Sequence, residues 1–187
     1  MGNMTEIRWH GRGGQGAVAS AEMLALAAIG EGKSAQAFPS FGPERRGAPV
    51  MAFTRVGDEF IHIRTGVTEP DVVVVLDPSV MGAVDVTSGL KENGIVIANT
   101  SKTREELADQ FDIDHPLYVV NATRIALDVI GRPITNTTMM GALVKVTGLV
   151  ELSSVEDQIS ERFPRVAEKN IEALRLAFEE TRAREEK

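Results

Sequence analysis

Two clusters near the start of the chain carry residues that can bind an anion. The first is the glycine-rich run Gly11-Arg12-Gly13-Gly14-Gln15-Gly16, and the second is the pair Arg45 and Arg46. A glycine turn that leads into a helix exposes unpaired backbone N–H groups, which together with the helix dipole attract a phosphate. Guanidinium groups bind phosphates and carboxylates through paired hydrogen bonds. Together the two clusters suit a phosphorylated cofactor better than either does alone.

The residues around the glycine run predict a strand, a sharp turn and a helix. Ile7–His10 is short and alternating, as in a strand, and the Ala-rich segment after Gly16 has apolar residues at helical spacing. A reversal from strand to helix usually needs positive φ angles, which glycine adopts at little cost. The turn therefore has a steric purpose whether or not a ligand binds there.

A nucleotide is one alternative ligand for this turn. Gly11, Gly13 and Gly16 match the G-x-G-x-x-G pattern, which is weak evidence when it stands alone. The acidic residue expected about 20 residues later in a dinucleotide-binding fold is absent from Lys33–Phe38, which reads as the second strand. Two further alternatives stay open. The turn can serve packing alone, and Arg45 and Arg46 can form salt bridges across a subunit interface.

Three apolar runs farther along the chain predict central strands of a parallel sheet. They are Asp71–Leu76, Gly94–Ala98 and Leu117–Val120, and each is followed by small polar residues. Unbroken apolar strands are typical of a parallel sheet covered on both faces, and ligands collect at the carboxyl ends of such strands. Helix capping is the simpler explanation for Asp77, Ser101 and Asn121, each taken singly.

The remaining pattern completes a fold of the α/β class. Val50–Val56 and Phe60–Arg64, separated by Gly57-Asp58-Glu59, predict an antiparallel hairpin. Helices are expected at Thr103–Phe111, Ala122–Ile130 and Thr138–Val150. A further helix is expected to be capped by Ser153, with Glu156 in the capping-box position. Pro164 interrupts this predicted helix, which continues to a charged end. We therefore expect a single domain over residues 1–187: three α/β/α layers, a mainly parallel sheet with an antiparallel hairpin at its edge, and C-terminal helices.

Composition excludes several classes of function. The net charge of −7 argues against nucleic acid as a partner, and no apolar run is long enough for a membrane span. No signal peptide is visible at the N-terminus, so a cytoplasmic location is expected. With no cysteine and three scattered histidines, the chain offers no ligand set for a metal or an iron–sulfur cluster. No motif for a nucleophile or a P-loop is present, and no catalytic residue is predicted.

Three motifs resemble a known family. Gly11–Gly16, the segment Phe38–Gly47 that contains Pro-Glu-Arg-Arg, and Asn136-Thr137-Thr138-Met139-Met140-Gly141-Ala142 look like the gamma subunit, or fused gamma domain, of 2-oxoacid:ferredoxin oxidoreductases. Pyruvate:ferredoxin oxidoreductase is the best known of these, and aryl-oxoacid relatives such as phenylglyoxylate oxidoreductase share the motifs. The resemblance covers nearly the whole chain.

The resemblance implies a place in a hetero-oligomeric complex. Such complexes oxidatively decarboxylate a 2-oxoacid, pass two electrons to ferredoxin or another acceptor, and transfer the acyl group to coenzyme A. Thiamine diphosphate, Mg²⁺ and 4Fe-4S clusters are then expected on partner subunits. The residues agree, because the chain has no cysteine and lacks the Gly-Asp-Gly start of the usual thiamine diphosphate motif. We therefore expect a subunit without redox chemistry of its own.

Two roles follow for such a subunit. It is a structural partner of the thiamine-binding chains, through the Phe38–Gly47 loop and its apolar helices. In addition, the glycine turn, with Arg45 or Arg46 nearby, contacts coenzyme A. The rival hypothesis is a stand-alone Rossmann-like protein that binds a nucleotide or a flavin as a monomer.

Overall fold

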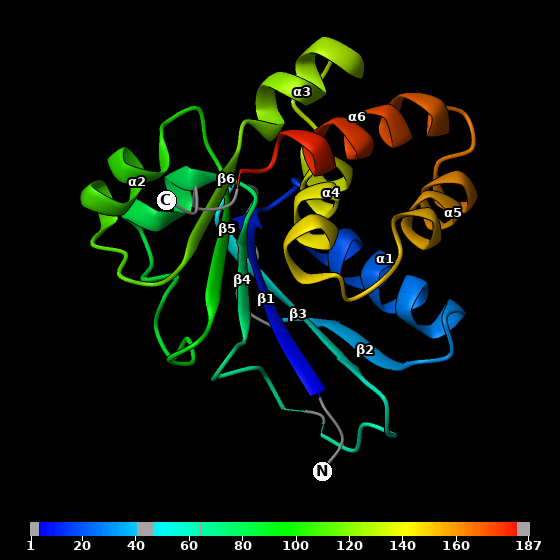
Figure 1. Cartoon of the computed structure of the whole chain (residues 1–187), viewed down its shortest axis with the longest axis horizontal. Helices are drawn as coiled ribbons and strands as arrows, with labels where there is room; N and C mark the ends of the chain where they lie inside the picture. Colours follow the sequence, from blue (N-terminus) through cyan, green and yellow to red (C-terminus); the bar gives the residue numbers. More distant parts are fainter. Residues whose placement is uncertain (1–3, 41–46, 64, 183–187) are drawn as a thin grey trace.

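The computed structural model, which describes residues 4–40, 47–63 and 65–182, is built around a six-stranded sheet of order β2-β3-β1-β4-β5-β6 (Figure 1). The strands are β1 (Met4–Arg12), β2 (Ser34–Pro39), β3 (Pro49–Gly57), β4 (Val72–Val75), β5 (Ile95–Asn99) and β6 (Leu117–Val120). The helices are α1 (Ala17–Gly30), the 3-10 helix η1 (Pro78–Gly82), α2 (Arg104–Phe111), α3 (Ala122–Val129), α4 (Asn136–Thr147), α5 (Leu152–Arg162) and α6 (Ala167–Glu180).

The sheet has a parallel half and an antiparallel half. β1, β4, β5 and β6 run parallel to one another, as the apolar runs predicted. β3 pairs antiparallel with β1 on one side and with β2 on the other. β2 is antiparallel to β3 and therefore parallel to β1, so β1-α1-β2 joins two parallel strands, but β3 lies between them and runs antiparallel to both. This arrangement differs from the first unit of a dinucleotide-binding fold.

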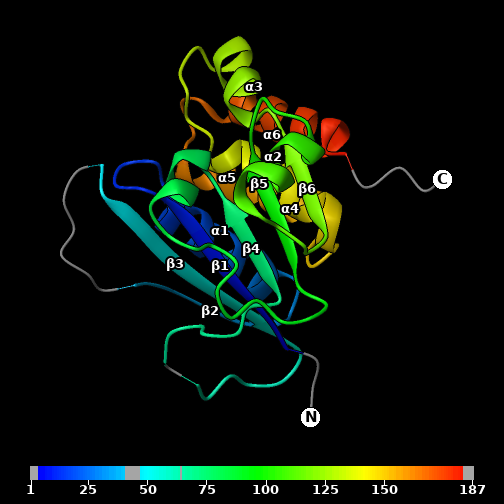
Figure 2. The same ribbon diagram turned by 90° about the vertical axis from the view of Figure 1, so that its left-hand side faces the viewer.

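Helices cover both faces of the sheet, unequally. Successive strand residues point to opposite faces, so Val72 and Val74 pack among the helices α1, α3, α4, α5 and α6, while Val73 and Val75 pack against η1 and the α2 side. Figures 1 and 2 show the larger helical layer on one face and the smaller one on the other. The predicted three-layer α/β class is confirmed.

The predicted hairpin between Val50–Val56 and Phe60–Arg64 is wrong. The described part of that second segment, residues 60–63, is not a strand, and Arg64 lies outside the described residues. The reason is that β3 already has a neighbour on each edge, β2 and β1, so no edge of β3 is left for a third strand. The antiparallel pair at the edge of the sheet exists, but it consists of β2 and β3.

The capping predictions are partly correct. Asp77 caps η1 by accepting a hydrogen bond from the Ser79 N–H (2.9 Å), and Asn121 caps α3 by accepting one from the Arg124 N–H (3.0 Å). Ser101 is not a cap, because Thr103 forms the capping box of α2 with Glu106. Ser153 is not a cap either. It lies inside α5, whose N-cap is Glu151 without a side-chain hydrogen bond.

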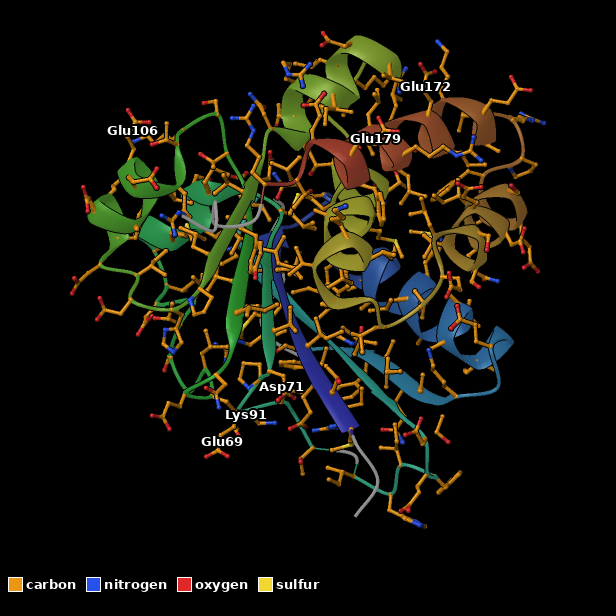
Figure 3. The ribbon with its side chains drawn as sticks, in the orientation of Figure 1. Glu69, Asp71, Lys91, Glu106, Glu172 and Glu179 are labelled. Atoms are coloured by element: carbon orange, nitrogen blue, oxygen red, sulfur yellow. The ribbon has the colours of Figure 1, made fainter. Side chains whose placement is uncertain are left out.

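Ion pairs close the amino end of the sheet. Lys91 Nζ lies 2.8 Å from Asp71 Oδ1 and 3.8 Å from Glu6 Oε2, and Glu6 also pairs with the buried Arg55 at 2.8 Å. Figure 3 shows Asp71 and Lys91 together at this end, with Glu69 beside them. A ligand-binding site is therefore expected at the opposite, carboxyl end of the sheet. No helix in the described ranges has both the length and the apolar character that crossing a membrane requires.

Candidate functional site

The glycine turn lies at the point where the sheet topology reverses. From β1 the chain leaves through α1 toward the antiparallel half, whereas β4 begins the parallel half on the other side of β1. Such switch points are where open α/β sheets bind ligands. Gly11 and Arg12 belong to β1, so the turn itself is Gly13–Gly16. Gly14 and Gly16 have φ angles of 95° and 82°, which confirms the predicted need for glycine.

The first turn of α1 presents free backbone donors. The first hydrogen bond of the helix runs from the Ser20 N–H to the Gly16 carbonyl (2.9 Å). The N–H groups of Ala17, Val18 and Ala19 precede that bond, and they have no acceptor within the described ranges. Gly16 carries no side chain that can cap them. These amides and the helix dipole favour an anion at this position.

Arg12 holds the turn in place instead of offering a free charge. Its guanidinium donates to the Ser79 Oγ (2.7 Å) and to the Gly47 carbonyl (2.9 Å), and its Nε lies 3.8 Å from Asp77 Oδ2. Gln15 completes the network: its Oε1 accepts from the Arg12 N–H (2.7 Å) and its Nε2 donates to Asp77 (2.6 Å). Within the predicted glycine-rich site, Arg12 and Gln15 are therefore positioning residues.

Asp77 is the centre of that network. Burial raises the pKa of its carboxyl, but hydrogen bonds from Ser79 and Gln15 and the charge of Arg12 outweigh burial, and the pKa lies below its ordinary 3.8. Asp77 is thus an ionised acceptor that ties the end of β4 to the glycine turn. Polar residues were predicted to lie together at the carboxyl ends of the parallel strands, and Asp77 does so.

Asn136, the first residue of α4, forms the other wall of the turn. A Cβ added at Gly16 would lie 2.7 Å from Asn136 Nδ2. The Asn136 side chain is 6% exposed, and its Oδ1 has no hydrogen-bond partner among the described residues. A buried amide oxygen without a partner costs free energy, so it needs an explanation. A ligand that donates a hydrogen bond there would supply one.

A largely apolar cavity of about 430 Å³ opens at Asn136. Its lining comes from the loop before α4 and from the α5–α6 junction, and includes Ile134, Phe163, Val166 and Asn170. Arg132, whose side chain is exposed, lies at its rim. Asn170 is fully engaged, because its Oδ1 accepts from Thr137 (2.8 Å) and its Nδ2 donates to the Val166 carbonyl (2.8 Å). The other polar residues of the lining are Arg132 and Asn136.

The structure brings together some of the predicted residues and leaves others apart. Asn99 serves the fold, because its Nδ2 donates to the Leu76 carbonyl (2.8 Å) and to Thr123 (2.8 Å). Arg45 and Arg46 lie outside the described residues, so their predicted position near the turn stays a prediction. Asn136 was not among the predicted site residues. The sequence did contain a signal for this residue: Asn136 begins the motif Asn136–Ala142 and is a polar residue at the start of an apolar helix.

Most of the chain matches known proteins. The family model described as pyruvate ferredoxin/flavodoxin oxidoreductase matches residues 6–180. The chain belongs to this family. It is 57% identical over 180 residues to the pyruvate/ketoisovalerate oxidoreductases common subunit gamma of Thermococcus litoralis, a match that covers 95% of this chain and 97% of that protein. The chain is thus a gamma-type subunit of the family, as its motifs predicted.

Solved structures agree with this assignment. The crystal structure of pyruvate oxidoreductase subunit PORC from Thermotoga maritima superposes with a TM-score of 0.88 at 45% identity, covering 97% of this chain and 99% of that chain. A 2-oxoglutarate:ferredoxin oxidoreductase from Magnetococcus marinus shares the fold, with a TM-score of 0.73 at 18% identity. The match covers 94% of this chain and 30% of that longer chain. The same fold therefore occurs both as a separate subunit and within a larger polypeptide.

Proposed function

We propose that this chain is the gamma subunit of a complex that converts a 2-oxoacid, coenzyme A and an oxidised acceptor into an acyl-CoA, CO₂ and a reduced acceptor. Thiamine diphosphate, Mg²⁺ and the 4Fe-4S clusters belong to partner subunits, and ferredoxin or another acceptor receives the electrons. The absence of cysteine from the sequence supports this division, because clusters of this kind are held by cysteine thiolates. The chain itself contributes shape and a contact with coenzyme A.

The observation that carries the coenzyme A contact is Asn136 Oδ1. It is buried without a partner among the described residues, and the Asn136 side chain packs against Gly16, which directly precedes the free amides at the start of α1. Coenzyme A carries phosphates that suit those amides, and amide N–H groups on an apolar arm that suit Asn136 and the cavity. The related Magnetococcus marinus enzyme is described with 2-oxoglutarate, coenzyme A and succinyl-CoA bound.

Arg45 and Arg46 stay part of the proposal. Gly47 and Ala48, which follow them directly in the sequence, are attached to the glycine turn: the Gly47 carbonyl accepts from Arg12 (2.9 Å) and the Ala48 carbonyl accepts from the Gly13 N–H (3.0 Å). This attachment keeps Gly47 and Ala48 beside the turn. A guanidinium from the arginine segment, Arg45 and Arg46, would add charge-assisted hydrogen bonds to the phosphates.

The choice of 2-oxoacid belongs to the partner chains under this proposal. The Thermococcus litoralis relative is named as a common subunit of pyruvate and ketoisovalerate oxidoreductases. A subunit that contacts only coenzyme A would serve both substrates without change, because coenzyme A is shared by the two reactions.

The test replaces Asn136 by leucine in the assembled complex. Asn136→Leu removes the unpaired oxygen while keeping the number and branching of the side-chain heavy atoms, so the free energy of unfolding of the isolated chain is expected to stay equal or to rise. The apparent affinity for coenzyme A is expected to fall at least about tenfold, which corresponds to ~1.4 kcal/mol. Titration of coenzyme A against the complex, followed by acyl-CoA formation, measures the change.

Thr138→Val is the matched control. Thr138 Oγ1 is also buried without a partner among the described residues and lies in the same helix, but Thr138 does not line the cavity. This variant is expected to leave the affinity unchanged. Gly14→Val and Arg46→Ala probe the turn and the arginine segment in the same titration. Unchanged affinity in Asn136→Leu, Gly14→Val and Arg46→Ala alike would eliminate the coenzyme A contact and leave only the structural role.

A further inference from the structure

The two edges of the sheet differ in how the chain covers them. At the β6 edge, the Arg182 N–H donates to the Val119 carbonyl (3.4 Å), so the C-terminal segment forms a bridge there. At the β2 edge, no strand within the described ranges pairs with the outer side of the sheet. Figure 1 shows β2 as the outermost strand on the side of α1. One edge is thus covered and the other is open.

The register identifies which backbone groups are open. The Ser40 N–H donates to the Met51 carbonyl (2.9 Å), and the same register pairs Phe38 with Phe53 and Gln36 with Arg55. In an antiparallel pair, alternate residues direct both backbone groups toward the partner strand. Phe38 and Gln36 therefore face β3. The N–H and C=O groups of Ala35 and Ala37, which lie between them, face outward without a backbone partner among the described residues.

β2 has little of the protection that is usual for an edge strand. Natural sheets discourage pairing at an edge with charged side chains, bulges or prolines. The strand Ser34–Pro39 reads Ser-Ala-Gln-Ala-Phe-Pro and contains no charge. Its proline is at the final residue, which leaves the donors of Ala35 and Ala37 free. Such a strand is suited to receive another one.

Exposed apolar side chains lie in a segment that contacts β2. The Ile61 carbonyl accepts a hydrogen bond from Gln36 Nε2 (2.8 Å), which places the segment after β3 against β2. Its neighbours Phe60 and Ile63 are 73% and 46% exposed. Large aromatic and aliphatic side chains of this kind are typical anchors of protein interfaces.

We propose that the open edge of β2, together with Phe60 and Ile63, docks an extended segment of a larger subunit of the complex as an additional strand. Unpaired backbone donors and acceptors two residues apart are satisfied by another extended backbone. Asp58 and Glu59 are exposed at the adjoining end of β3, and the chain carries a net charge of −7. These charges favour a partner segment with basic residues over a second copy of this chain. The inference rests on the proposed assembly into a complex.

Amide hydrogen exchange, resolved to single residues, tests the pairing directly. The amides of Ala35 and Ala37 are expected to exchange fast in the isolated chain and at least roughly 50-fold more slowly in the complex, the effect of two or three added hydrogen bonds. The amides of Gln36 and Phe38, which face β3, are expected to be protected in both. Equal exchange of Ala35 and Ala37 in the two states would overturn the proposal. So would protection that grows with the concentration of the isolated chain, since it would mean that a second copy occupies the edge.

Variants give an independent measure of assembly. Ala37→Pro removes an outward donor without removing a bond to β3, and Phe60→Ser removes an anchor. Leu127→Ser on α3 is the matched control, because Leu127 is 48% exposed and α3 packs on α4 and α6. The yield of complex that co-purifies is expected to fall at least about tenfold in the first two variants and to equal the wild-type yield in the control. If Ala37→Pro unfolds the chain, Phe60→Ser decides.

The docking surface is overturned if Phe60→Ser, and also Ala37→Pro where that variant folds, gives the wild-type yield of complex. The proposed function would then stay intact. A wild-type chain that enters no complex would overturn both. The two failures are thus distinguishable by whether the wild-type chain enters a complex.

Discussion

At the scale of single residues, two glycines of the same turn are required for different reasons. Gly14 and Gly16 both have φ angles in the left-handed region, 95° and 82°. No atom lies within 4 Å of a Cβ built at Gly14, whereas a Cβ at Gly16 would lie 2.7 Å from Asn136 Nδ2 and 3.1 Å from its Cβ. Gly14 is required for its backbone conformation, and Gly16 is required for conformation and for the close approach of α4.

We therefore expect Gly14→Ala and Gly16→Ala to differ. Gly14→Ala should cost about 1 kcal/mol of unfolding free energy, the strain of a left-handed alanine. Gly16→Ala should cost roughly 2–4 kcal/mol, because Asn136 must also move. Urea unfolding of the two isolated variants measures the difference. Equal losses in the two variants would show that the contact with Asn136 is unimportant.

At the scale of elements, the helical layer depends on one close approach between α4 and α6. A Cβ at Gly141 would lie 2.0 Å from the Leu174 carbonyl oxygen and 3.0 Å from the Phe178 nitrogen. These are backbone atoms, which cannot rotate away as a side chain can. The contact sets the position of α4, and with it the position of Asn136 above the glycine turn.

Gly141→Ala is expected to destabilise the chain by at least about 2–3 kcal/mol, since the two helices must separate. Gly30→Ala, at the end of α1, is the control, because nothing lies within 4 Å of its added Cβ. That substitution should stabilise by up to ~1 kcal/mol, the difference in helix propensity. Thermal unfolding of both variants gives the comparison, and a stabilised Gly141→Ala chain would contradict the packing described above.

At the scale of the whole molecule, a histidine buried within the fold links global stability to pH. His10 is 3% exposed, and its Nε2 accepts a hydrogen bond from Arg8 Nε (3.0 Å). Burial and then the charge of Arg8 lower the pKa of His10 from 6.5 to about 3, although Asp85 acts in the opposite direction. The imidazole is therefore neutral in the folded chain at all pH values near neutrality.

The sign of the pH dependence follows from this lowered pKa. The unfolded chain binds a proton at His10 below pH 6.5, and the folded chain does so only near pH 3. Stability from this group is thus fully present above pH 6.5 and is lost as the pH falls toward 3, at about 1 kcal/mol per pH unit. In urea unfolding at about pH 7.5 and about pH 5.5, on either side of the unfolded pKa, His10→Gln should lose less stability on acidification than the wild type. An identical pH slope in the wild type and in His10→Gln would refute the assignment.

Local sequence was sufficient for the features that depend on neighbours along the chain. The strand, glycine turn and helix around Gly11–Gly16 follow from steric limits on φ, and the parallel strands follow from unbroken apolar runs. The caps at Asp77 and Asn121 lie two and three residues from the amides they serve. The absence of cysteine likewise limits the chemistry of this chain, because no arrangement of the other residues can supply a thiolate.

Only the tertiary structure decided the partners that are distant in sequence. Phe60–Ile63, the described part of the predicted strand, does not pair, because β2 and β1 occupy both edges of β3. Asn136 lies far from Gly16 along the chain, and the close packing of α4 on α6 brings its side chain to the turn. Neither outcome is encoded in a local window, since each depends on which long-range contacts exclude the alternatives.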